Sequence, residues 1–180
     1  VRVDPAQPGD WAAALRIVDA GLRADGPVPG FAQLDGTLRM TAAAGAFEFD
    51  APGFSFDAAA VFRAPFFFDT ARGRLAWTRS AGGWQIDIGR LELANPGIAA
   101  IAHGTVTLPA DGGSPLLDLT AEVPRLLVAA APTYLPDHEV GAGGTDWLDR
   151  GLVAGRGHDG RVRLRGRADG FPYRDGDGEF

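Results

Sequence analysis

The residues of this chain that could do chemistry are few and dispersed. His103 and His158 stand alone, and only the run Asp137-His138-Glu139 places an imidazole beside carboxylates. A metal centre or an acid–base pair needs several groups that converge on one point, and an exposed loop explains this run more simply. The histidines therefore predict no metal site.

The other motifs that could carry chemistry are incomplete. None of the serines, Ser55, Ser80 and Ser114, lies in the G-x-S-x-G pattern of a nucleophile elbow. The run Asp175 to Gly178 lacks the spacing and the terminal glutamate of a calcium loop, and the run Gly141 to Gly144 carries no lysine for a phosphate. We therefore expect no enzyme activity and no cofactor.

Arginines recur at every second position from Arg161 to Arg167, opposite Val162 and Leu164. In a strand this spacing puts the guanidinium groups on one face. Guanidinium forks suit phosphate, so a headgroup site is one interpretation. A solvated strand face, neutralised by Asp169, Asp175 and Asp177, is the simpler one.

Composition favours a β structure that does not bind nucleic acid. The 180 residues are 46% hydrophobic and include 26 glycines and 13 prolines, which is too apolar for disorder and too interrupted for a helical bundle. The net charge of −6 argues against binding to a phosphate backbone. The chain has no cysteine for a disulfide or a thiolate site. No apolar run approaches the roughly 20 residues of a spanning helix.

The pattern of the chain divides it into four stretches. Trp11, Leu15, Val18 and Leu22 recur at helical spacing, so residues 10–22 are predicted to form a helix. Residues 34–123 alternate apolar with polar or small residues in about eight runs separated by short turns, which predicts antiparallel strands. Residues 124–155 are predicted to be a helical island, and residues 160–180 to return to strand. Pro65 demotes the stretch around it to an edge strand or a bulge.

The alternation gathers fifteen large apolar residues on one predicted face. They are Phe47, Phe49, Phe54, Phe56, Leu75, Trp77, Trp84, Ile86, Ile88, Leu91, Leu93, Val106, Leu108, Leu117 and Leu119. Alternation alone favours a closed sandwich or barrel, because half-buried antiparallel sheets are common. The same face in an open, curved sheet would be an apolar groove.

Three segments near the end of the chain carry a family resemblance. They are Tyr134-Leu135-Pro136, the tryptophan-bearing stretch Trp147 to Gly155, and the aromatic-proline-aromatic run Phe171-Pro172-Tyr173, preceded by the strand Ser114 to Leu119. Together they resemble the YhdP branch of the AsmA-like proteins. In that family Trp147, Leu148, Phe171 and Pro172 correspond to structural anchors.

The resemblance implies a mainly β fold: a curved, largely antiparallel sheet that forms an open groove or half-barrel with two or three short helices. It implies one fragment, residues 1–180, of a longer periplasmic protein that is anchored in the inner membrane and carries phospholipid toward the outer membrane. The expected partners are phospholipid acyl chains and neighbouring segments of the same parent chain. The abrupt ends, Val1 and Phe180, suggest cut sheet edges that would pair between copies.

Overall fold

The computed structural model describes residues 2–3, 11–26, 28–135, 137–171, 173, 176 and 178–180. Within these residues, thirteen strands belong to one sheet, and every strand pair between them is antiparallel. The prediction of a mainly β, antiparallel sheet is confirmed.

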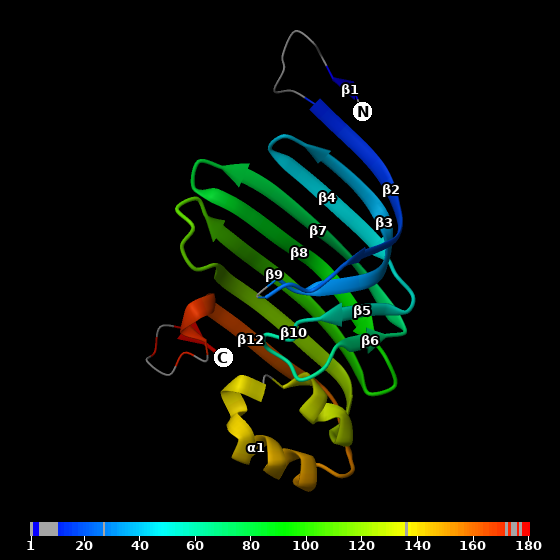
Figure 1. Cartoon of the computed structure of the whole chain (residues 1–180), viewed down its shortest axis with the longest axis vertical. Coiled ribbons are helices and arrows are strands. Elements are labelled where there is room, and N and C mark those ends of the chain that lie inside the picture. Colours follow the sequence, from blue (N-terminus) through cyan, green and yellow to red (C-terminus); the bar gives the residue numbers. More distant parts are fainter. Residues whose placement is uncertain are drawn as a thin grey trace.

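Ten strands follow one another across the sheet, down the long axis in Figure 1. In spatial order they are β1 (Arg2–Val3), β2 (Trp11–Leu22), β3 (Gly30–Thr41), β4 (Ala44–Asp50), β7 (Thr70–Ser80), β8 (Gly83–Ala94), β9 (Ile98–Pro109), β10 (Leu116–Leu127), β12 (Gly160–Arg167) and β13 (Gly178–Glu179). Five of these strand pairs, β2–β3, β3–β4, β7–β8, β8–β9 and β9–β10, are joined by short loops or turns, so these neighbours in sequence are neighbours in the sheet.

Three short strands leave this path. Strands β5 (Phe54–Asp57) and β6 (Phe66–Phe68) form a hairpin that joins the sheet through β3, and β11 (Arg156–Gly157) pairs with β10. Strand β6 begins directly after Pro65 and pairs with β5, so it is the edge strand that the proline predicts.

Helical turns follow β10 and lie at the lower end of the sheet in Figure 1. They are η1 (Val128–Tyr134) and α1 (Asp137–Gly151), and a single turn, η2 (Ala168–Gly170), follows β12. The predicted helical island therefore begins later than Pro124, because β10 continues to Leu127. Within the predicted island, α1 begins at Asp137 and ends at Gly151.

The predicted helix at residues 10–22 is wrong. This segment is strand β2, which pairs with β3 from Ala12 to Leu22. Its pairing register shifts twice, between Ile17 and Ala20 and between Ala20 and Leu22, and Asp19 takes a positive φ of 52°. These irregularities break the period of two, so the apolar residues acquire a spacing that resembles a helix.

The sheet is open and its core is small. Its outermost long strands, β2 and β12, do not pair with each other in the described part of the chain. The buried hydrophobic residues there are Phe47, Ala51, Phe68, Ala71 and Tyr173. A closed sandwich or barrel, the alternative that alternation alone favours, would bury far more large side chains, so it is ruled out.

Candidate apolar groove

All the apolar residues of the predicted face on the long strands lie on one side of the sheet. Direct pairing places Phe47 beside Leu75, Leu75 beside Ile88, and Ile88 in a row with Leu119 through Gly104. A second row runs from Trp77 through Ile86 and Val106 to Leu117. Residues that pair directly across strands share a face, so these rows form one continuous surface, here called the apolar face.

A bulge keeps this face continuous in β8. Ile88 and Leu91 are three positions apart and would point to opposite sides of a regular strand. The register shift between them inserts Gly89 and Arg90 as an irregularity, so Ile88 pairs with Gly104 and Leu91 with Ala102 on the same side. Trp84, paired with Leu108, and Leu93 complete this stretch of the face.

Aromatic rings lie over glycines on the apolar face. A Cβ on Gly36 would stand 2.6 Å from the ring of Phe47, and a Cβ on Gly73 would stand 3.0 Å from Cζ of Phe49. The rings of Phe47 and Phe49 are stacked, with centroids 5.6 Å apart. Because glycine has no side chain, the large rings can pack flat against the sheet. The rings and the strands beneath them form a wide apolar surface, here called the floor of the groove.

The hairpin of β5 and β6 crosses part of the sheet (Figure 1). Its side chains and those of the floor enclose a cavity of about 530 Å³, here called the roofed pocket. Phenylalanines of the hairpin and of the loop between its strands form the roof, strands β3, β4, β7, β8 and β9 form the floor, and Tyr134 of η1 closes one side. The lining residues are Phe31, Leu34, Phe47, Phe49, Phe54, Phe56, Phe62, Phe66, Phe68, Leu75, Leu91, Leu93, Ile98, Ala100 and Tyr134.

Seven of the predicted face residues line this pocket: Phe47, Phe49, Phe54, Phe56, Leu75, Leu91 and Leu93. The other eight, Trp77, Trp84, Ile86, Ile88, Val106, Leu108, Leu117 and Leu119, lie outside it on the uncovered part of the face and are half-buried. The face therefore consists of a roofed part and an open part.

Polar groups near the pocket are turned away from it. Asn95, in the turn between β8 and β9, donates from Nδ2 to the carbonyl oxygen of Phe67 at 2.7 Å and to Oη of Tyr134 at 3.0 Å. Its Oδ1 accepts hydrogen bonds from the amides of Gly97 and Ile98, both at 2.9 Å. The hydroxyl of Tyr134 is thereby satisfied outside the cavity, and the ring alone faces the interior.

The opposite, polar face of the sheet carries cross-strand ion pairs. Asp50 accepts from Arg72 at 3.0 Å, and Glu48 lies 3.8 Å from Arg74. The arginines of β12 join the same pattern, with Arg161 near Glu122 and with Arg163 and Arg165 near Asp118. The arginines of β12 thus lie among carboxylates on the polar face. This placement agrees with a solvated, charge-neutralised strand face and not with a headgroup site.

The carboxylates that pair with the arginine row differ from those predicted. Asp169 does contact Arg167, at 3.3 Å, and hydrogen bonds from Ser114 and then from Arg167 lower the pKa of the Asp169 carboxyl. Glu179 lies 3.4 Å from Arg163, while Asp175 and Asp177 lie outside the described residues. No cluster of three or more potential metal ligands occurs among the residues that the structure describes.

The comparisons with known proteins now identify the family. A family model described as the YhdP protein matches residues 1–180, the whole chain. The chain belongs to the YhdP family. Searches of curated proteins and of solved structures found no match. YhdP membership suggests an envelope protein with a role in lipid transport. In the described part of this YhdP chain, no helix has the length and the hydropathy required to cross a membrane.

The anchors that the YhdP resemblance implies are only partly where expected. Trp147 is 66% exposed on α1, so it is not a buried packing residue, whereas Leu148 is half-buried. Phe171 is half-buried and contacts the rings of Tyr173 and Phe180 edge-on, with centroids 6.0 and 5.0 Å apart. Pro172 lies outside the described residues.

Tyr173 is the packing residue that sequence reasoning missed in this YhdP chain. It is 7% exposed and takes a positive φ of 60°. Its ring fills the space over Gly166 and Gly178, where a Cβ would approach it to 2.6 and 2.5 Å. Burial raises the pKa of its hydroxyl, and the charge of Asp169 adds to the effect. In the sequence, Tyr173 ends the aromatic-proline-aromatic run, and the glycines at positions 166, 170 and 178 are the further signal for its packing.

Proposed function

We propose that this chain is a periplasmic segment of an AsmA-like bridge protein and that its apolar face holds phospholipid acyl chains between the inner and outer membranes. The parent protein would be anchored in the inner membrane and would maintain the outer-membrane barrier. The chain would act by binding and guiding lipid, without catalysis and without a cofactor. The observation that carries the proposal is an entirely apolar pocket continuous with an open apolar face in a YhdP-family chain.

The pocket suits a hydrocarbon chain. Its volume of about 530 Å³ lies within the usual range of ligand sites, about 300–1,000 Å³. Its one polar side chain, Tyr134, has its hydroxyl engaged with Asn95. A phosphate or an amine would find no partner inside, so the headgroup would remain in solvent.

The energetics favour reversible binding. Each buried methylene contributes about 0.8 kcal/mol, so about ten methylenes contribute about 8 kcal/mol. Association costs about 4–15 kcal/mol, which offsets half of this gain or more. A ligand held in this way would exchange readily, as transport along a groove requires.

Delipidated protein titrated with a fluorescent fatty acid tests the proposal. Leu91 lies in the pocket, and aspartate there would place a charge against the acyl chain, so Leu91→Asp should abolish binding. Leu116 is 46% exposed on the polar face, so Leu116→Asp is the matched control and should bind as the wild type does. The proposal would be contradicted if the wild type did not bind the probe, or if Leu91→Asp bound it as well as Leu116→Asp and the wild type do.

A further inference from the structure

The hairpin that roofs the pocket is attached to the sheet by few strand contacts. Strand β5 pairs with β3 at three positions, Gly30–Asp57, Phe31–Phe56 and Ala32–Ser55, and β6 pairs with β5 at three. In contrast, β8 and β9 pair at ten positions. Strand β6 has no second strand partner in the described part of the chain. Residues 54–68, here called the flap, thus form a narrow arm at the side of the sheet.

At β6 the flap is held by a hydrogen bond from Nδ2 of Asn95 to the carbonyl oxygen of Phe67, at 2.7 Å, and its inner side is held by aromatic contacts. The ring of Phe66 packs against that of Phe62 within the flap, with centroids 4.7 Å apart, and it contacts the ring of Tyr134 in η1, with centroids 5.4 Å apart. Such contacts are not directional, and an acyl chain could replace them with little loss of buried apolar area. The apolar contacts alone therefore do not fix the flap in its closed position.

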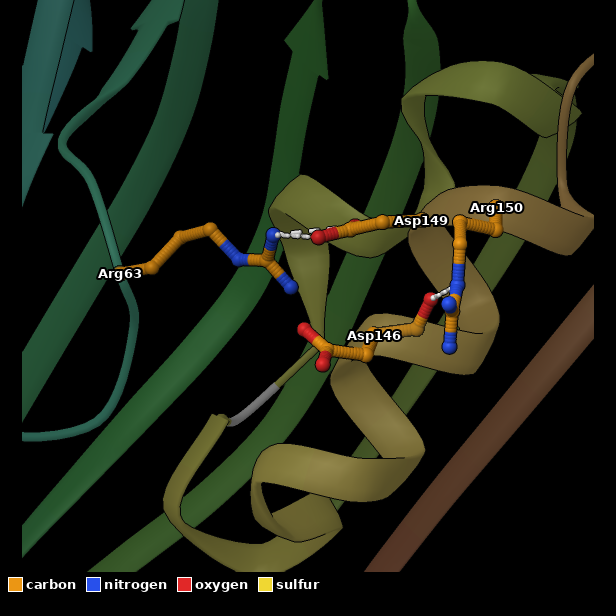
Figure 2. A network of polar contacts seen from close by, with 4 residues as sticks. All are labelled: Arg63, Asp146, Asp149 and Arg150. Carbon is orange, nitrogen blue, oxygen red and sulfur yellow. Dashed lines mark hydrogen bonds and ion pairs between the residues drawn. The ribbon is translucent and has the colours of Figure 1, made fainter.

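A directional contact holds the tip of the flap. Nη1 of Arg63, in the loop between β5 and β6, donates to both carboxylate oxygens of Asp149 on α1, each at 3.0 Å. Figure 2 shows the two side chains meeting between the loop and the helix, with the carboxylate of Asp146 on the same side of the guanidinium. This contact joins residues 86 positions apart in sequence.

None of the described side chains of α1, the helix that supplies Asp149, is buried. Trp147 points largely into solvent, and the element that α1 chiefly contacts is η1. Nε of Arg150 donates to the backbone oxygen of Asp146 at 3.0 Å, which braces the turn of the helix that carries Asp149. The helix thus stands at the end of the sheet as a support that reaches the flap through Asp149.

We propose that the flap opens and closes over the roofed pocket and that the Arg63–Asp149 ion pair is its latch, so that the latch controls how fast an acyl chain enters and leaves from the side of the groove. This regulation rests on the proposed function. The side chains of Arg63 and Asp149 are 29% and 43% exposed. A pair this accessible is weak, so its loss should change the opening rate by about two- to fivefold.

Stopped-flow release of a fluorescent fatty acid from the 180-residue chain tests the latch. Asp149→Asn should release the probe about two- to fivefold faster than the wild type. Asp50→Asn breaks the ion pair with Arg72 on the polar face and is the matched control, with release unchanged. Added salt should accelerate release from the wild type but not from Asp149→Asn, because salt screens the pair.

A cross-link tests the same idea in the opposite direction. The chain has no cysteine, so Arg63→Cys with Asp149→Cys provides a unique pair of thiols for a short bis-maleimide. The cross-linked protein should release the probe more slowly than the same protein before cross-linking. Equal release rates in the wild type, Asp149→Asn and the cross-linked protein would overturn the latch while leaving the proposed function intact.

Hydrogen exchange distinguishes a failure of the proposed function from a failure of the latch. If the wild type binds no probe, the proposed function fails, and the latch is then judged from the amides of residues 58–66 alone. Faster exchange of these amides in Asp149→Asn than in Asp50→Asn would support a latched flap. The same exchange in both variants would overturn it.

Discussion

The indole of Trp77 lies directly over Gly45 on the neighbouring strand. A Cβ at Gly45 would collide with Cζ2 of the indole and would stand 2.5 Å from Cε2. The two residues pair directly between β4 and β7, so the ring occupies the space that a side chain would take. Glycine at position 45 therefore allows the tryptophan to form part of the floor of the groove.

Gly45→Ala should lower the free energy of unfolding by about 1–3 kcal/mol, the usual cost of overpacking. Thermal or urea denaturation measures the change. Gly89→Ala in β8 is the control, because its Cβ would meet no atom closer than 3.7 Å and its φ is not positive. Equal stability of the two variants would mean that Trp77 does not lie on Gly45.

Trp147→Ala should leave the thermal midpoint almost unchanged. The side chain is 66% exposed, and surface substitutions usually change stability by less than about 0.5 kcal/mol. Phe47, which is 8% exposed, provides the contrast: Phe47→Ala should cost about 3–5 kcal/mol. A large loss for Trp147→Ala would instead place the indole in a packed interface.

Tyr173→Phe should raise the free energy of unfolding by about 1 kcal/mol. The buried hydroxyl has no hydrogen-bond partner among the described residues, so its removal relieves an unpaired polar group. Tyr134→Phe is the control and should be destabilising, since the hydroxyl of Tyr134 bonds to Asn95. Urea denaturation of both variants gives the comparison, and a destabilised Tyr173→Phe would contradict the assignment.

The stability of the wild type should fall as the pH rises above about 10, the ordinary pKa of tyrosine. Burial raises the pKa of Tyr173 in the folded state, so the unfolded state loses its proton first as the pH rises. The contribution of Tyr173 to stability is complete below the pKa that its hydroxyl has in the unfolded state. It is lost as the pH rises toward the higher pKa of the same hydroxyl in the folded state. The decline should be smaller in Tyr173→Phe, and an identical pH profile would show that burial does not shift this group.

The outer edges of β2 and β12 should make the protein self-associate. In the described part of the chain, β2 has no outer partner from Ala13 to Leu22, and β12 has none from Gly160 to Leu164. Unpaired backbone groups attract strands from other copies. Light scattering across a concentration series should show growing assemblies, and Leu15→Lys on the apolar face of β2 should suppress them. A wild type that stays monomeric at high concentration would contradict this prediction.

The alternation of apolar residues was sufficient to predict which residues share one apolar face, whereas the open form of the sheet was implied by the family resemblance and not by the alternation. Leu75, Ile86 and Val106 lie where period two places them, because each long strand is exposed to solvent on its polar side. The bulge between Ile88 and Leu91 is also visible in the sequence, since the apolar pattern changes phase at Gly89 and Arg90. Local patterns sufficed wherever pairing was regular.

Tertiary contacts decided the features that the sequence did not reveal. The run Phe66-Phe67-Phe68 does not alternate, so nothing local indicates that it roofs a pocket against Tyr134. Strand β2 was mistaken for a helix because its irregular pairing with β3 obscures the strand period. Trp147 is a structural anchor according to the family resemblance, yet α1 leaves its side chain largely in solvent.

The most direct test of the groove is to photolabel the protein with a diazirine fatty acid and map the labelled residues by mass spectrometry. The account predicts labels on the apolar face, at residues such as Phe49, Leu91 and Ala100 around the roofed pocket. Residues on the polar face of the same sheet, such as Arg72 in β7 and Leu116 in β10, should remain unlabelled. Labelling of both faces alike, or of neither, would contradict an acyl-chain groove.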